Sequence, residues 1–352
     1  MISCPLEYAL NFPREPKFES RCLYVVGGLY GNIFALEQIL AMADAENASV
    51  VFNGDIHWFD AEAKSFCKIE REIAKRGLTA VNGNVEFELV SGQNGCGCFY
   101  PPCTDAGAVG RSNLIHARLS RLVKKECAQN LEIFKNRHKC ELISVGGANV
   151  AITHGDEKFL AGWGCSRESL SEPVRQKELD AWLAENKFDV LACTHTCASA
   201  AIALQHGIVI NNGAAGMPNF APLNLEFAEV REILKFTEKT SSEENDISQN
   251  AQADEILKFK GEGFHARNLS GTLFGLISRI AVRPNKEAIY RAKRGRIYVE
   301  ALPVRYDGVK FLKWFDEIWG AQSPAAISYR SRIVSGTTDK ISDAMLGGFT
   351  QI

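Results

Sequence analysis

Four side chains that can bind a metal ion each follow a short apolar run in this chain of 352 residues. They are Asp55, Asn84, His154 and His195, and a glycine stands beside each of the first three. Apolar runs of this length predict buried strands, and open α/β sheets place their chemistry at the carboxyl ends of such strands. A carboxylate, an amide oxygen and two imidazoles form a donor set for one divalent cation. We therefore expect the four side chains to converge on one metal ion.

The segment from residue 22 to residue 81 alternates between predicted strands and helices. Apolar runs lie at 22–27, 49–53 and 78–81, and apolar residues at helical spacing lie at 33–45 and 61–75. Asn32 is expected to cap the first of these helices. Such alternation predicts a parallel sheet with right-handed crossovers.

The rest of the chain mixes helices with strands that pair locally. Further strands are expected at 141–145, 150–153, 188–193, 272–282, 289–291 and 297–304, with a hairpin at 201–210. Further helices are expected at 112–129, 131–136, 174–185 and 309–319. Residues 92–110 are rich in glycine and cysteine and are predicted to form a loop.

The chain is predicted to form one large domain with two extensions. The domain spans residues 20–305, the N-terminal extension 1–19, and the C-terminal extension 306–352 is expected to pack on the domain. Residues 236–254 contain too few apolar side chains to pack and are expected to form a mobile insertion. No role is assigned to residues 221–270.

The composition predicts a soluble cytoplasmic protein with mainly reduced cysteines. Apolar residues make up 46% of the chain, and 40 basic residues nearly balance 42 acidic ones. This balance gives no signal for nucleic acid or an anionic membrane. No signal peptide or membrane span is expected. A chain of this size needs no disulfides to fold, so its eleven cysteines are expected to be free thiols. The oligomeric state is not predicted.

The motifs around these residues resemble those of the calcineurin-like metallophosphoesterases, especially their small bacterial phosphodiesterase branch. The family pattern runs Asp-x-His-Gly-Asn, Gly-Asp, Gly-Asn-x-Asp/Glu, His-Gly, Gly-His-Thr-His and Asn-Pro-Gly-Ser. In this chain the matching stretches are GLYGN at 28–32, GD at 54–55, GNVE at 83–86, THG at 153–155, THTC at 194–197 and NNGA at 211–214. The resemblance covers about residues 20–216. It implies an α/β fold, a four-layer α/β/β/α sandwich of two mixed β-sheets.

The resemblance also implies which ligands are kept and which are lost. The family holds two metal ions bridged by the aspartate of Gly-Asp. The second metal's ligands would be Asp55, Asn84, His154 and His195, and all four are present. The first metal's own ligand positions carry Gly28, Tyr30 and Cys197, so that site is degenerate. Loss confined to one metal suggests that the other metal is still used.

A first metal could still be held by different ligands. Tyr30 and Cys197 can themselves bind a metal, and His57 lies two residues beyond Asp55. Phenolate, thiolate and imidazole ligands would suit ferric iron or zinc better than magnesium. The alternative for His57 is a packed, partly buried histidine beside Trp58.

Two further segments are expected near the site. By the resemblance, the turn at Asn211, Asn212 and Gly213 lies beside the metals together with Asn32, and its backbone N–H groups would hold a phosphate. Cys96, Cys98 and Cys103 lack the spacing of a zinc knuckle and are read as structural thiols, in a loop that can lie over the site.

The resemblance implies hydrolysis of a small phosphomonoester or phosphodiester by a metal-activated water, with one intact metal site. The metal can be Mn, Zn, Fe, Ni or Mg, and no catalytic side chain is assigned. The alternative is a catalytically inactive protein that binds a metal or phosphate or serves as a scaffold. A third possibility is thiol chemistry at a pocket that gathers Cys197 with neighbouring cysteines.

Overall fold

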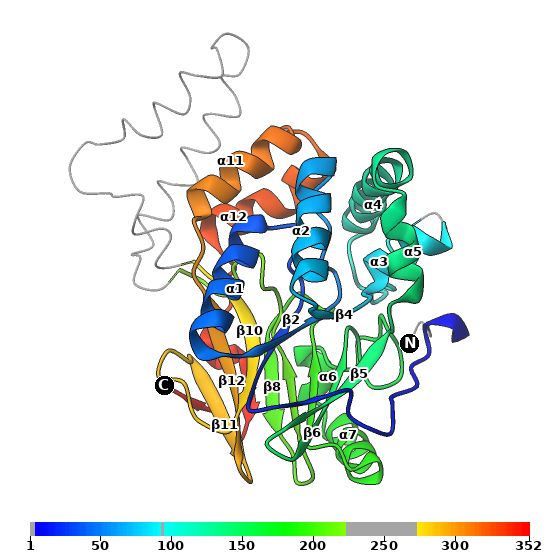
Figure 1. Cartoon of the computed structure of the whole chain (residues 1–352). Helices are drawn as coiled ribbons and strands as arrows, with labels where there is room; N and C mark the ends of the chain where they lie inside the picture. The colour runs from blue at the N-terminus through cyan, green and yellow to red at the C-terminus, as the bar shows by residue number, and fades with distance from the viewer. Residues whose placement is uncertain (1–3, 93–94, 223–272) are drawn as a thin grey trace, which may run out of the picture.

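The structure, a computed structural model, describes residues 4–92, 95–222 and 273–352 and is built around two seven-stranded sheets (Figure 1). The predicted insertion at 236–254 lies outside the described residues, as do nearly all of residues 221–270.

The first sheet combines parallel and antiparallel pairs. β6 is antiparallel to β5 and parallel to β7, and the predicted hairpin is the antiparallel pair β8 and β9. The strand order of this first sheet is β1 (Glu19–Ser20), β5 (Cys140–Val145), β6 (Ala148–Thr153), β7 (Val190–Cys193), β9 (Ile208–Asn211), β8 (Ala200–Ala203) and β13 (Met345–Gly347).

The second sheet is mixed as well. The alternation read from the sequence is confirmed, because β2, β3 and β4 are parallel and are joined by α1 (Ile33–Glu46) and α2 (Ala63–Lys75). The other strands pair antiparallel to their neighbours. The order is β14 (Thr350–Gln351), β11 (Tyr290–Arg294), β12 (Ile297–Val304), β10 (Gly275–Ala281), β2 (Cys22–Val26), β3 (Ser49–Asn53) and β4 (Thr79–Val81).

Alternating side chains of β2 show how the layers are stacked. Leu23 and Val25 pack against apolar residues of the first sheet, whereas Tyr24 and Val26 pack under the helices on the other face. The outer helices of the second sheet include α1, α2, α4 (Ala106–Glu126) and α11 (Gly308–Ile318), and those of the first are α6 (Arg167–Ser171) and α7 (Pro173–Asn186). The remaining short helices are η1 (Leu6–Tyr8), α3 (Asn84–Ser91), α5 (Gln129–Asn136), η2 (Ala326–Arg330), α12 (Ser331–Ser335) and η3 (Ile341–Ala344).

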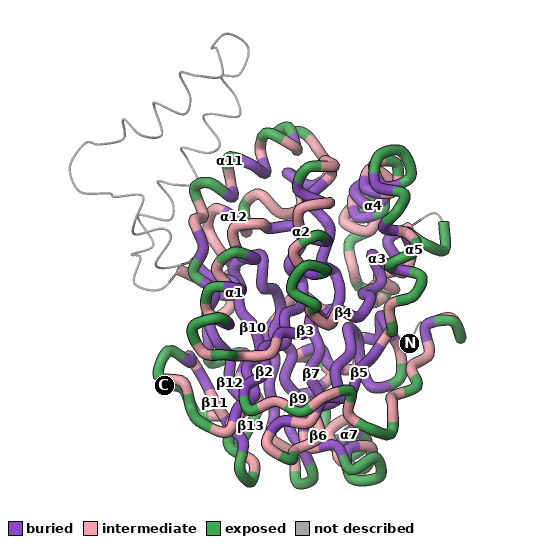
Figure 2. Tube along the Cα trace, in the orientation of Figure 1, coloured by how far each residue is buried: buried purple, intermediate pink, exposed green. Residues whose placement is uncertain are grey.

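Burial follows the same layers. Both sheets are buried along their central strands, and exposed residues lie on the outer helix faces, on loops and on edge strands such as β14 (Figure 2). The predicted four-layer α/β/β/α sandwich of two mixed sheets is therefore confirmed.

The C-terminal extension is built into both sheets. β13 pairs with β8 in the first sheet, and β14 pairs with β11 in the second. Within the described residues, no helix is both long and apolar enough to cross a membrane.

A buried arginine joins α1 to the second sheet. Only 2% of the Arg279 side chain is exposed, and it forms ion pairs with Glu46 of α1 and Glu300 of β12. Its Nη1 also donates to the carbonyl oxygen of Arg283, at 2.9 Å. Glu300 is fully buried, so removal of this arginine would leave its carboxylate with the half-buried Arg291, at 3.2 Å, in place of two cations.

We expect Arg279→Gln to lower the free energy of unfolding by about 3–5 kcal/mol, the usual effect of breaking a buried ion pair. Arg76→Gln is a matched control, because Arg76 pairs with Asp44 on the surface and its loss is expected to change stability by less than about 1 kcal/mol. Urea denaturation of both variants measures the difference. Equal effects would show that burial of Arg279 adds nothing.

Candidate functional site

The four predicted ligands lie just beyond the ends of four strands. Asp55 follows β3 and Asn84 follows β4 in the second sheet, while His154 follows β6 and His195 follows β7 in the first. Because β3 and β4 are parallel, and β6 and β7 are parallel, the carboxyl ends of each pair meet at one edge. The facing edges of the two sheets thereby bring the four side chains together.

The donor atoms of these side chains converge on one ring nitrogen. Nε2 of His154 lies 3.3 Å from Oδ1 of Asp55, 3.0 Å from Oδ1 of Asn84 and 3.1 Å from Nδ1 of His195. Two ligands held about 2.1 Å from one ion at right angles are about 3.0 Å apart. The observed contacts are therefore of the size found between ligands of one metal ion.

Every N–H group of the two imidazoles and the amide has an acceptor elsewhere. Nδ1 of His154 bonds the carbonyl of Asn53, and Nε2 of His195 bonds the carbonyl of Cys98. The amide nitrogen of Asn84 donates to the carbonyl of Cys96, at 2.7 Å. With those protons committed, the lone pairs of Nε2 of His154, Nδ1 of His195 and Oδ1 of Asn84 point at one another, an arrangement that a shared cation or proton stabilises.

The titration behaviour of the cluster agrees with this arrangement. Burial lowers the pKa of His195 to about 3, with help from the neighbouring His154, so its imidazole is neutral. Burial also acts to lower the pKa of His154, but Asp55 outweighs burial and the pKa is raised. Burial acts to raise the pKa of Asp55, yet the two histidines hold it below its usual value. A positive charge at this centre is therefore stabilised.

Two glycines allow the strand ends to approach. Gly54 has φ of +95°, and a Cβ there would lie 2.5 Å from Cα of Gly83 and 2.7 Å from Nδ1 of His154. A Cβ on Gly83 would lie 2.4 Å from Oδ1 of Asp55. Only residues without a side chain fit at these positions.

The Glu86 carboxylate fixes the loop that carries Asp55. It accepts backbone N–H bonds from Gly83 and Asp55 on one oxygen and from Ile56 and His57 on the other, at 2.8–3.2 Å. Asp55 itself has φ of +49°, which is uncommon for a residue with a Cβ. This role of Glu86 was not predicted, although its place three residues after Gly83 is typical of a capping residue.

These residues fit a metal ion in donor type and orientation. Within the described residues, no group of three or more His, Cys, Asp and Glu side chains is spaced as a metal site. Three of the donors here belong to those types, the fourth is an amide, and the other three each lie within 3.3 Å of Nε2 of His154. The ligand roles of Asp55, Asn84, His154 and His195 therefore stay a prediction, which the converging lone pairs support.

The positions of the lost first-metal ligands are filled by side chains of the protein itself. A Cβ on Gly28 would lie 2.8–2.9 Å from the phenol ring of Tyr30, so the ring occupies the space beside that glycine. The hydroxyl of Tyr30 lies 2.7 Å from Sγ of Cys197. Burial raises the pKa of both groups, so phenol and thiol are neutral.

The structure does not bring His57 to this pair. Its Nδ1 lies 2.6 Å from Oδ2 of Asp60, its Nε2 lies 2.9 Å from Oε1 of Glu70, and its ring stacks on Phe66. Burial acts to lower its pKa, but the two carboxylates raise it to about 10, so His57 is a buried cation. The suggested metal set of Asp55, Tyr30, His57 and Cys197 stays a prediction, and these contacts do not support it for His57, because both its nitrogens are already bonded.

The phosphate-binding role of the turn at Asn211, Asn212 and Gly213 also stays a prediction, which the hydrogen bonds of the turn do not support. Its N–H groups already have acceptors inside the protein: Asn212 bonds Cys193 and Gly213 bonds the side chain of Asn211. The N–H groups of residues 214–216 are bonded in the same way, to Asn219, Gly27 and Gly28. Asn32 caps α1 through Oδ1, as predicted, and its amide nitrogen donates to Gly216.

The loop at residues 95–104 covers the cluster. Its carbonyl groups at Cys96 and Cys98 accept the bonds from Asn84 and His195, and that of Cys98 also accepts from Nε1 of Trp163. Cys98 brings its thiol within 3.3 Å of the amide nitrogen of Asn84. All eleven cysteines are free thiols.

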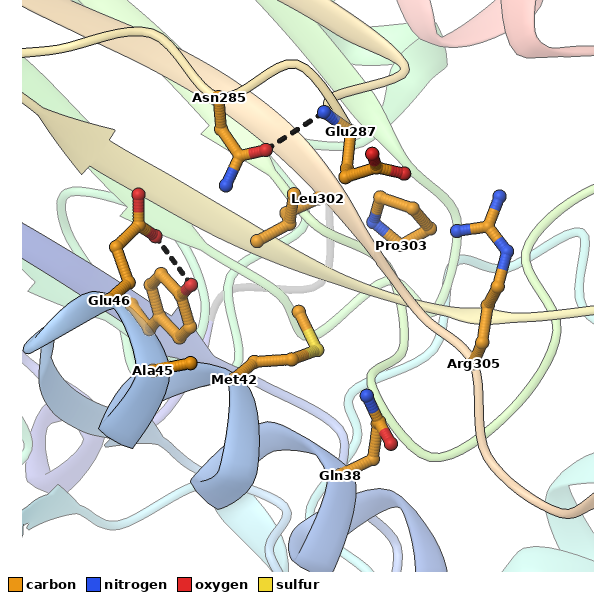
Figure 3. A pocket seen from close by; sticks show the side chains of 10 residues that line it. Gln38, Met42, Ala45, Glu46, Asn285, Glu287, Leu302, Pro303 and Arg305 are labelled. Atoms are coloured by element: carbon orange, nitrogen blue, oxygen red, sulfur yellow. Dashed lines mark hydrogen bonds between the residues drawn. The ribbon is translucent and has the colours of Figure 1, made fainter.

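Two hollows in the described part of the chain lie away from the cluster. One is bordered by α1 and β12, where Glu46 bonds the hydroxyl of Tyr24 (Figure 3). The other lies beside α2 and α5 and includes Glu70 and Arg137. Neither hollow contains any of the four predicted ligands. The cluster itself is nearly closed, with 8% of the Asp55 side chain exposed and none of that of His154.

Comparison with solved structures bears on the fold. A hypothetical protein from Pyrococcus horikoshii OT3 is 10% identical, with a TM-score of 0.50 over 90% of this chain and 100% of that one. A metallophosphoesterase from Sphaerobacter thermophilus is 12% identical (TM-score 0.44; 90% and 99% covered), and Vacuolar Protein Sorting 29 from Cryptosporidium parvum is 12% identical (TM-score 0.33; 80% and 96% covered). No family model and no curated protein matches the chain. At these identities the likeness shows a shared fold and no activity.

We expect His57→Gln to leave the metal content of the purified protein unchanged and to lower the free energy of unfolding by about 3–5 kcal/mol, because the buried Asp60 loses its cation while Glu70 keeps only Arg137. His138→Gln is the control, since His138 is an exposed histidine paired with Glu141. Elemental analysis and urea denaturation measure the two effects. Loss of one metal ion per chain in His57→Gln alone would restore the ligand role of His57.

Proposed function

We propose that this chain, which has the fold of the calcineurin-like phosphoesterase superfamily, binds one divalent metal ion and hydrolyses a small phosphoester. The ion would be held by Asp55, Asn84, His154 and His195. The observation that carries the proposal is the convergence of their lone pairs on one point while every N–H group among them is bonded elsewhere.

Each side chain has a defined part in such a site. Asp55 supplies the negative charge, and 8% of its side chain is exposed. His154 and His195 present single nitrogens, because their other nitrogens are held by backbone carbonyls. A bound divalent cation would supply a Lewis acid that polarises a phosphoryl oxygen and lowers the pKa of a water molecule.

The site offers no side-chain acid at the position after Asn84. That position is Val85, which is buried, and an apolar side chain cannot protonate a departing oxygen. Substrates whose leaving group is already a weak base are therefore favoured. This argues for aryl phosphoesters as the first substrates to test.

A second function is favoured by a different observation. The loop at residues 95–104 covers the cluster, and two of its carbonyl groups hold Asn84 and His195 in place. A metal ion held under such a cover would order the loop without turnover. The second candidate is therefore a metal-binding module whose ion has a structural role.

The ligand set is tested by the metal content of the purified protein. We expect one ion per chain in the wild type. Asp55→Asn, His154→Ala and His195→Ala should each lower metal affinity by more than about 100-fold, because even the outer partners of metal ligands contribute about 10- to 100-fold. His206→Ala is a matched control, since His206 is a half-exposed histidine paired with Asp180. Unchanged affinity in all three ligand variants would reject the site.

Hydrolysis separates the two candidate functions. We expect p-nitrophenyl phosphate or its bis-ester to be hydrolysed in the presence of Mn²⁺, Ni²⁺, Co²⁺, Zn²⁺ or Fe²⁺, faster than the phenyl analogue, and this activity to be lost in Asp55→Asn. Activity that survives Asp55→Asn would come from a contaminant. Protein that binds one ion per chain and hydrolyses neither ester would be the metal-binding module.

A further inference from the structure

Arg332 reaches the site from the C-terminal extension, outside the part of the chain that resembles the metallophosphoesterases. It lies on α12, and its Nη2 donates to the carbonyl oxygen of Cys197 at 2.9 Å. Its Nε donates to the carbonyl oxygen of Pro218 at 2.7 Å. Two bonds to backbone carbonyls thus hold the guanidinium against Cys197, one of the lost first-metal ligand positions.

The guanidinium of Arg332 is not paired with an acidic side chain in the described part of the chain. No carboxylate there lies within ion-pair distance of Arg332, whereas its neighbour Arg330 is paired with Asp316 at 2.9 Å on two nitrogens. The two acceptors that hold Arg332 are the backbone carbonyl oxygens of Cys197 and Pro218, which carry no charge. A half-buried cation whose fixed contacts are neutral carbonyls keeps its charge for an anion.

The charge at this side of the site differs in kind from that of a two-metal site. Gly28 has no side chain, and the hydroxyl of Tyr30 lies 2.7 Å from Sγ of Cys197, so no carboxylate or imidazole stands at the first metal's own ligand positions. Arg332 supplies one positive charge beside Cys197, and its Nη1 bonds no acceptor within the described residues.

We propose that Arg332 binds an oxygen of the phosphoryl group of the substrate, on the side of the cluster where Tyr30 and Cys197 stand at the first metal's ligand positions. The inference rests on the proposed function only for the identity of the ligand, a phosphoester. A planar guanidinium with several N–H donors matches the oxygens of a phosphoryl group. The arginine then takes over the orienting and charge-neutralising part of the missing ion.

Binding of inorganic phosphate to the full-length, metal-free protein tests this role. Isothermal titration calorimetry should give an affinity about 10- to 100-fold lower for Arg332→Gln than for the wild type, the size expected when hydrogen bonds to a charged group are removed. Arg332→Lys keeps the charge but loses the planar fork and should fall between the two. Arg330→Gln, two residues away, should bind phosphate like the wild type.

The metal content separates this role from that of the ligands. Arg332→Gln should hold the same amount of metal as the wild type and, if esters are hydrolysed, show a raised KM. Equal phosphate affinity in wild type and Arg332→Gln, or no phosphate binding by the wild type, would overturn the inference. If Arg332→Gln fails to fold, Arg332→Lys decides, and wild-type affinity in it overturns the inference. If the ligand variants of the previous subsection kept their metal, the proposed function would be rejected. The phosphate titration of the metal-free protein would still decide the role of Arg332.

Discussion

The site depends on a repulsion between lone pairs that the fold brings face to face. Neutral imidazoles and amides in a protein interior normally point a proton of one at a lone pair of another. Here the backbone carbonyls of Asn53, Cys96 and Cys98 take the protons of His154, Asn84 and His195, and three acceptors are left facing one another beside Asp55. Such an arrangement needs a positive charge at its centre. A proton on His154, whose pKa is raised, would supply this charge in the metal-free protein, and a metal ion would supply it with more bonds.

The neighbouring half of the site, at the first metal's own ligand positions, needs no cation. Gly28 makes room for the ring of Tyr30, and the phenol bonds the thiol of Cys197. Both groups are neutral, so no cation is needed to balance them. The two halves therefore favour opposite charges. The half formed by the four predicted ligands attracts a cation, and the half that carries the guanidinium of Arg332 attracts an anion. A phosphoryl group is a ligand that can bind to both at once.

The sequence predicted the parts of this arrangement that depend on nearby residues. The strand ends that carry the four donors, the cap at Asn32 and the strand and helix alternation follow from local periodicity, and the structure confirms these elements. The buried ion pairs of His57 could not be predicted. Its partner Glu70 lies on the following helix, α2, and Glu70 is paired in turn with Arg137, which comes much later in the sequence. The bonding of the turn at 211–216 could not be predicted for the same reason, since Gly27 and Gly28, far away in sequence, accept two of its N–H groups. Arg332 lies 135 residues from the carbonyl that it bonds, and no motif connects them.

The cover over the cluster limits where a substrate can enter. The carbonyl of Cys98 fixes the tautomer of His195 and that of Cys96 orients Asn84, so a displaced loop would free the very protons whose positions define the cluster. The loop at 95–104 is therefore a part of the site, and its opening would disrupt the arrangement of the four donor side chains. The side chain of Asp55 is 8% exposed, and Cys197 and Arg332 are half-buried. An anionic group that contacts Arg332 meets a cation there, so it is favoured over a neutral group.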